Sequence, residues 1–254
     1  MLFAAAKSVR LLLSLAFLLA FCQSNCYAYT IQGQIEHVES LPAVAPELRS
    51  GAEYTGPGDS GVNNKWQMIP HWLAGTWLVR QETAVYQRDY KTGRVSDTPR
   101  TYRAKQEFFY GSQLDRNGNV WHFNGVPYTS ETRLSDYIEY HKVTSKTFQV
   151  ANANEVRFRT LMTVVRVSPS TETIIKSFQQ ESITSYKPDG DGQIQLTSSI
   201  KAFDDNGNAV HETCNTATIK RIKPFVQIDH RDGKDLAHLF KNYLIKSNMT
   251  YLLP

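Results

Sequence analysis

Seven turn signals divide residues 76–222 into eight long segments, and this punctuation constrains the fold more than any other feature of the chain. Gly, Pro, Asn and Asp gather at the breaks, as they do in tight turns. The eight segments are 76–90, 99–111, 119–132, 136–150, 155–167, 172–187, 193–203 and 209–222. Such segments form neighbouring antiparallel strands, and eight strands close a small barrel. We therefore predict an all-β, eight-stranded antiparallel up-and-down barrel.

Alternation of side chains supports this prediction and suggests an inner face. In segment 99–111 the even-numbered positions are mostly apolar or aromatic, while the odd ones carry Arg, Lys and Glu. Tyr102, Gln106, Phe108 and Tyr110 mix large rings with a polar group, as ligand pockets do. We predict that these four residues line a cavity. The alternative is that the aromatic residues simply fill the barrel.

An amphipathic helix is predicted after the strands. Asp232 is a good N-cap for a helix over 233–247. One apolar stripe follows, which predicts docking on the outer wall of the barrel: Leu236, Leu239, Phe240, Tyr243 and Leu244. Pro224 interrupts the eighth strand, so 225–230 is the candidate for a ninth.

The N-terminus has the pattern of a secretory signal peptide over residues 1–28. A positively charged start precedes an apolar run over 11–21, which is too short to span a bilayer comfortably, and small residues precede position 29. The chain is therefore predicted to be exported, either periplasmic or secreted. The alternative is a lipoprotein anchored through Cys22 or Cys26.

Charge and cysteine content exclude several classes of protein. Loss of Lys7 and Arg10 with the signal lowers the formal charge from +4 to +2, too little to predict binding to nucleic acid or an anionic membrane surface. Only Cys214 then remains, so no intrachain disulfide is available. We expect Cys214 to be a buried small apolar residue.

Residues 29–64 are predicted to be a flexible arm because Pro and Gly break every regular period there. The next stretch, 66–73, has apolar residues at helical spacing and predicts a short helical turn. The predicted domain comprises residues 65–254.

One short motif gives the barrel a family resemblance. The stretch Leu73-Ala74-Gly75-Thr76-Trp77 resembles the Gly-x-Trp motif that opens the first strand of lipocalins. The resemblance implies a structural signature of Gly75, Trp77 and an arginine at the end of the last strand that packs on the indole. Arg231 is the matching residue, and Arg221 is the alternative if the barrel closes before Pro224. A more distant calycin relative is the alternative family.

No catalytic, metal or cofactor site is predicted. The seven histidines lack zinc-site spacing, although His71 beside Trp72 is a minor candidate for a haem ligand. Asp115–Asn119 and Asp204–Asn208 lack the later ligands of a calcium loop and are interpreted as hairpin turns. Motifs for nucleophilic hydrolysis, phosphate loops and dinucleotide binding are absent from the sequence.

These features together favour an exported, non-catalytic protein that binds a small apolar or amphipathic molecule. Two alternatives stay open. One is an enzyme of isomerase or cyclase type on the same barrel, an idea that rests on analogy of fold. The other is an envelope-associated structural or interaction module whose barrel interior is filled. The volume of the cavity separates the filled module from the other two.

Overall fold

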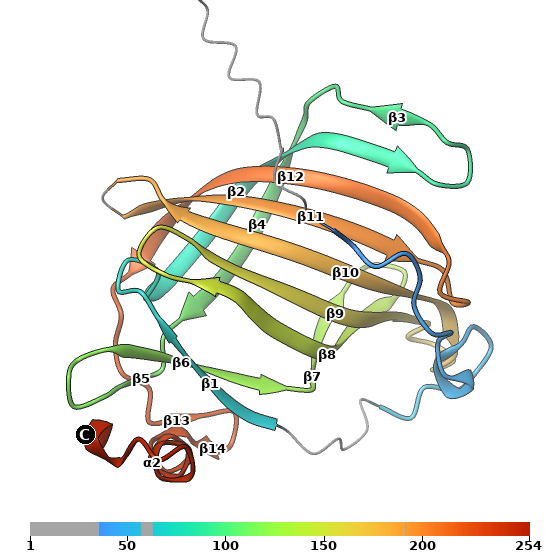
Figure 1. Ribbon diagram of the computed structural model, residues 1–254. Coiled ribbons are helices and arrows are strands. Elements are labelled where there is room, and N and C mark those ends of the chain that lie inside the picture. Colours follow the sequence, from blue (N-terminus) through green and yellow to red (C-terminus); the bar gives the residue numbers. More distant parts are fainter. Residues whose placement is uncertain (1–35, 57–62, 191) are drawn as a thin grey trace, which may run out of the picture. The chain divides into compact units, whose positions relative to one another are not determined.

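A single curled antiparallel sheet dominates the structure, a computed structural model that describes residues 36–56, 63–190 and 192–254 (Figure 1). Its strands follow the order β3-β2-β12-β11-β10-β9-β8-β7, and β4 also pairs with β2. The bounds are β2 Gly75–Asp89, β3 Val95–Ser96, β4 Arg100–Tyr110, β7 Tyr128–Arg133, β8 Ile138–Ala151, β9 Val156–Val167, β10 Ile174–Pro188, β11 Gln193–Phe203 and β12 Ala209–Lys223. The predicted signal peptide and its two candidate lipidation sites lie outside the described residues.

The prediction of long antiparallel strands is confirmed, but closure into a barrel is not shown. In the described part of the chain β4 pairs with β2 and β7 pairs with β8, and no ladder joins β4 to β7. The sheet therefore curls into a half-barrel whose two edge strands face a gap.

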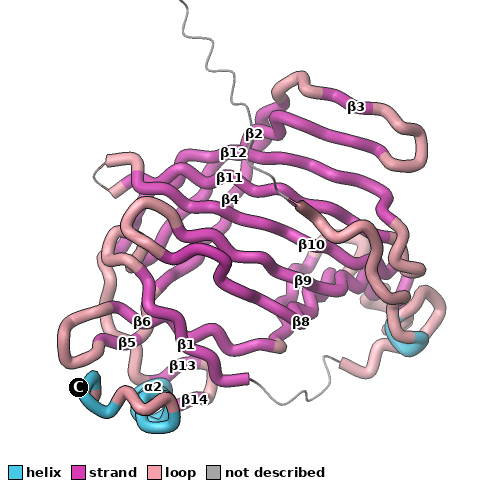
Figure 2. The backbone as a smooth tube through the Cα atoms, viewed as in Figure 1, coloured by secondary structure: helices cyan, strands magenta, loops and turns pink. Residues whose placement is uncertain are grey.

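One predicted strand, 119–132, is wrong because it is two strands in two sheets. β6 (Val120–Val126) ends directly before Pro127, and the chain then enters β7, which pairs in the large sheet. Proline has no N–H to donate, so it does not continue a central ladder. β6 instead pairs with β1 (Asn63–Ile69) and β5 (Gln113–Leu114) in a small three-stranded sheet, drawn below the large one in Figure 2.

The small sheet has an apolar face on each side, and this explains why the predicted helical turn over 66–73 is wrong. Residues 63–69 are a strand, and only 71–73 form a turn. Trp66 packs with Trp121 in one core, while Ile69 packs with Trp77 in another. Apolar residues that serve opposite faces of a strand here fall three positions apart, which resembles helical spacing.

The predicted C-terminal helix is present as α2 (Leu236–Lys246), but it packs on the small sheet. Its buried residues Leu236, Phe240 and Leu244 share a core with Trp66 and Trp121. The cap is Asp235, whose side chain accepts a hydrogen bond from the His238 N–H, at 2.9 Å. The earlier residues form a hairpin of β13 (His230–Arg231) and β14 (Lys234–Asp235), so 225–230 adds no ninth strand to the large sheet. Two 3₁₀ turns complete the elements, Pro46–Leu48 and Thr250–Leu252.

Trp77 is fully buried at the end of the large sheet where β2 begins, and the arginine that packs on it is Arg221. The Arg221 guanidinium lies 4.8 Å from the Trp77 ring centroid, because register places Arg221 opposite Trp77 on β12. The Trp77 indole N–H donates to the Leu73 carbonyl at 2.7 Å. Gly75 has φ +129°, and a Cβ there would lie 2.7 Å from the Lys223 carbonyl oxygen. The preference for Arg231 is therefore corrected, because β12 ends before Pro224.

The described part of the predicted flexible arm, residues 36–56, is docked on the large sheet. Glu181 is fully buried beneath it, with His37 Nδ1 2.7 Å and the Val38 N–H 2.9 Å from its Oε2 atom. Arg159 Nε lies 3.0 Å from the other carboxylate oxygen, and Lys201 donates to the Val38 carbonyl at 2.8 Å. Burial alone raises the pKa of Glu181, but the hydrogen bonds from His37 and Val38, together with the positive charges of Arg159 and His37, hold this pKa below its usual value.

We predict that Trp77→Ala lowers the free energy of unfolding by about 3–5 kcal/mol, because it leaves a cavity in the core. Urea denaturation checks this value. Tyr251→Ala is the control, since Tyr251 is 67% exposed. Equal midpoints for the two variants would show that Trp77 is peripheral.

We also predict that Glu181→Gln releases the arm, because it removes the carboxylate that His37, Val38 and Arg159 share. Limited trypsin digestion should then cut after Arg49 faster than in the unsubstituted protein. Glu39→Gln changes an exposed residue of the arm and should leave the rate as it was. A rate that stays equal in all three proteins contradicts the assigned role of Glu181.

Candidate functional site

The gap between β4 and β7 holds a cavity of about 610 Å³ that is partly open to solvent. β4, β6, β7, β8 and the β13–β14 hairpin supply its walls, so every element that borders the opening of the half-barrel contributes. Phe108 lines the cavity and is the register partner of Trp77, which places the pocket beside the Trp77 end of the large sheet. The lining includes Phe108, Phe109, Tyr110, His122, Tyr128, Ser130, Lys146, Arg231 and Lys234.

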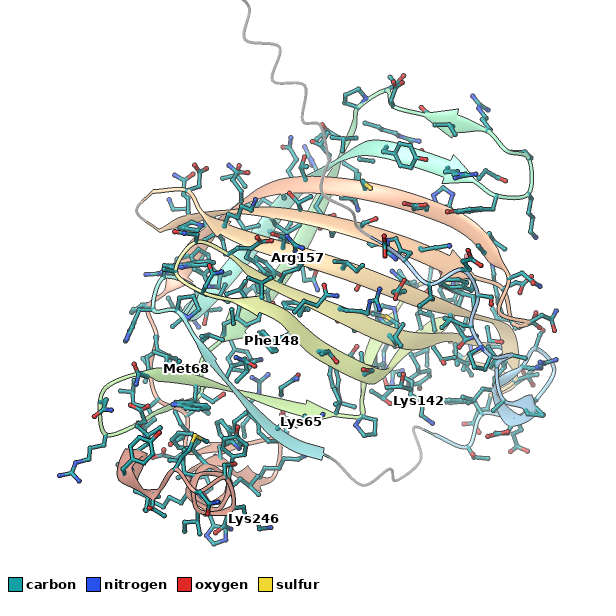
Figure 3. The ribbon with its side chains drawn as sticks, in the orientation of Figure 1. Lys65, Met68, Lys142, Phe148, Arg157 and Lys246 are labelled. Atoms are coloured by element: carbon teal, nitrogen blue, oxygen red, sulfur yellow. The ribbon has the colours of Figure 1, made fainter. Side chains whose placement is uncertain are left out.

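An aromatic cluster forms the inner side of this pocket: Phe108 and Tyr110 line it, and further rings of the core pack behind them. The Tyr110 ring centroid lies 5.6 Å from that of Phe108, 5.5 Å from that of Tyr186 and 6.2 Å from that of Phe158. The Tyr110 hydroxyl donates to the Tyr186 hydroxyl at 3.1 Å. Phe148 extends the cluster from β8 and is labelled in Figure 3. The rings belong to the main core, so this wall is apolar and rigidly packed.

His122 enters the cluster from the small sheet. The side chain is buried, and its ring centroid lies 5.3 Å from that of Tyr110 and 6.3 Å from that of Phe148. The Gly111 N–H donates to Nδ1 at 3.4 Å. Burial lowers the pKa of His122 well below its usual value, and the positive charges of Lys146 and Arg231 lower it further. The imidazole is therefore neutral at neutral pH.

Lys146 places an ammonium group against the aromatic wall. Its Nζ atom lies 4.5 Å from the Phe158 ring centroid and 5.5 Å from that of Tyr110. Desolvation by burial lowers the pKa of Lys146 to about 8. Within residues 36–56, 63–190 and 192–254, no ion pair or hydrogen bond involves this ammonium group. The contacts of this charge with the protein are ring faces, which attract a cation weakly, and the side chain is partly exposed to the open cavity.

Arg231 places a second cation in the pocket, on the side formed by the β13–β14 hairpin. The Arg231 guanidinium lies 3.5 Å from the Phe109 ring centroid, and its Nε atom lies 3.2 Å from Asp232 Oδ2. Lys234 and Glu107 also contribute to the lining. Arg231 and Asp232 largely cancel one another, as do Lys234 and Glu107, so the charge of Lys146 makes the lining positive overall.

Of the four predicted ligand-lining residues, two line the pocket. Phe108 and Tyr110 do, because β6 and the hairpin approach the end of β4. Tyr102 does not; it is 42% exposed, and its hydroxyl donates to Glu82 at 2.7 Å. Gln106 is exposed and also lies outside the lining.

Among the lining residues that were not predicted from the sequence, three matter most for the chemistry of the pocket: His122, Lys146 and Arg231. Lys146 had a usable signal, because it lies two positions before Phe148 in a strand and so shares its face. A lysine on an apolar face is unusual and suggests a site. His122 had no such signal. The two faces of β6 pack against two different cores, so its buried positions do not alternate with polar ones.

Other kinds of site gain no support in the described ranges. No cluster of three or more His, Cys, Asp or Glu side chains that could hold a metal ion occurs there. No helix there is long and apolar enough to cross a membrane. Cys214 is buried as predicted, and burial raises the pKa of its thiol.

Comparison of the chain with protein-family models, with curated proteins and with solved structures found no match in any of the three.

We predict that Lys146→Met raises the melting temperature at about pH 6 and that the gain shrinks above about pH 8. An unfolded lysine has a pKa of about 10.4, whereas the folded value is about 8. Below both values the charged group carries its full cost of burial, and between them the unfolded chain binds more protons, so stability rises with pH. His122 and Tyr110 titrate outside this window.

Thermal melts across this pH range check the effect. Lys65→Met, at an exposed lysine labelled in Figure 3, is the control and should show no pH-dependent gain. A Lys146→Met protein that melts below the unsubstituted protein at about pH 6 would contradict the assigned cost of burial.

Proposed function

We propose that this chain is an exported protein that binds a small apolar or amphipathic molecule, without catalysis, in the pocket between β4 and β7. The cavity of about 610 Å³ carries the proposal. Its volume falls in the usual range for small-molecule sites, roughly 300–1,000 Å³. An aromatic wall with a few polar groups is also the usual composition of such sites, since rings bind the apolar part and polar groups orient it.

We further propose a lipocalin-like, calycin-type architecture for the domain. The packing of Arg221 on Trp77 next to Gly75 supports it, together with the meander of antiparallel strands. In its most specific form, this proposal is that the domain is a closed eight-stranded barrel. The structure differs from a closed barrel mainly in that β4 and β7 do not pair, and the pocket lies in the gap between these two strands.

Export remains part of the proposal and rests on the sequence of residues 1–28, with lipid anchoring through Cys22 or Cys26 as the alternative. Mass determination of the mature N-terminus after expression with the signal distinguishes the two. Cleavage after residue 28 supports free export, whereas an acylated cysteine at the new N-terminus supports anchoring.

An enzyme of isomerase or cyclase type is the second candidate. One observation favours it: a lysine with a pKa of about 8 and a neutral histidine border the same pocket. Groups that titrate near neutral pH suit proton transfer. A filled structural module is disfavoured by the volume of the cavity.

We predict saturable binding of an environment-sensitive apolar dye, with micromolar or tighter affinity, and its loss in Ser130→Trp. Ser130 lines the mouth of the pocket and is exposed, so a large side chain there obstructs entry without disturbing the core. Ser170→Trp places the same side chain on an exposed turn and should bind the dye normally. Fluorescence titration measures both, and native mass spectrometry identifies co-purified molecules.

Two outcomes contradict the proposal. If the unsubstituted protein binds no apolar probe, the pocket is not a binding site for such molecules. If Ser130→Trp binds as tightly as Ser170→Trp, the dye occupies another place. Chemical conversion of a co-purified molecule during incubation with the protein would favour the enzyme.

A further inference from the structure

We infer that the pocket selects amphiphiles with a carboxylate head group and that Lys146 binds this carboxylate. The inference rests on the proposed function, because it needs the pocket to hold a small molecule. It adds the class of ligand and the residue that sets the specificity.

The ammonium group of Lys146 is the first reason. It lies among rings, 4.5 Å from the Phe158 centroid, and makes no ion pair or hydrogen bond in the part of the chain that the structure describes. The Lys146 side chain is partly exposed because it lines the open cavity, and none of the described residues offers its ammonium group an acceptor, although charges held largely away from water are ordinarily paired. An anionic ligand that enters the cavity supplies the missing partner.

The charges around the cavity are the second reason. His122 is neutral, so it adds no charge. The carboxylate of Asp232 is held by Arg231 at the hairpin, where the Arg231 guanidinium also lies over the Phe109 ring. Lys234 and Glu107 are a second pair of opposite charges in the lining, so the cation of Lys146 remains uncompensated, which matches a ligand with a single negative charge. A phosphate group carries more charge and needs several donors, as Arg forks and backbone nests supply.

The arrangement of polar and apolar walls is the third reason. Lys146 touches the aromatic wall itself, while the rings of Phe108 and Tyr110 continue along β4. A carboxylate at Lys146 therefore leaves its attached chain in contact with these rings. A charge-assisted contact at one end and apolar burial along the other is how a pocket recognises an amphiphile.

Displacement of the bound dye by dodecanoate and by dodecanol tests the inference, because these ligands differ only in the head group. In the unsubstituted protein we expect dodecanoate to bind at least about tenfold more tightly than dodecanol. In Lys146→Gln this preference should fall to about twofold or less, with the affinities for dye and dodecanol little changed. Lys65→Gln, at an exposed position outside the lining, should retain the preference.

Lys146→Arg separates a loss of charge from a disturbed fold, because it keeps a cation and should keep most of the preference. Equal affinity for dodecanoate and dodecanol in a protein that binds the dye overturns the inference and leaves the proposed function intact. A full preference retained in Lys146→Gln overturns it as well. Failure of the unsubstituted protein to bind any of the three probes overturns the proposed function together with the inference.

Discussion

The break in the chain at Pro127 is the constraint on which the rest of the structure depends. Before this residue the segment 119–132 pairs in the small sheet, and after it the segment pairs in the large one. Because proline has no N–H, the ladder stops there, and β6 joins β1 and β5 while β7 alone continues on β8. The two edges stay apart, the small sheet covers part of the gap, and the cavity occupies the remainder.

A pocket of this kind is costly, and the surrounding structure offsets the cost. Lys146 is half-buried without a counter-charge from the described residues, and a group of this kind in a cleft is a candidate for a functional role. The fully buried Trp77 holds one end of the large sheet, and the shared core of Trp121 and Phe240 fixes the small sheet against α2. Rigid walls on both sides keep the rings in place, as a preorganised binding site requires.

Much of the architecture could be predicted from sequence, because turn residues and alternation act locally. The Gly75–Trp77 motif located the start of β2, and Arg221 was one of two arginines predicted to pack on Trp77. The failures involve contacts between distant segments. Trp66 and Ile69 serve two cores, the arm docks through Glu181 on a remote strand, and the pocket forms where β4 and β7 fail to meet. Side-chain spacing along the chain carries no information on such pairings.

A crystal structure of the protein with ω-bromododecanoic acid tests the central claim most directly, because the bromine reports the position of the chain and the carboxylate reports its partner. The account predicts one anomalous peak in the gap between β4 and β7, with the carboxylate within hydrogen-bonding distance of Lys146 Nζ. A ligand bound elsewhere on the protein, or one in the gap with its carboxylate turned away from Lys146, would contradict it.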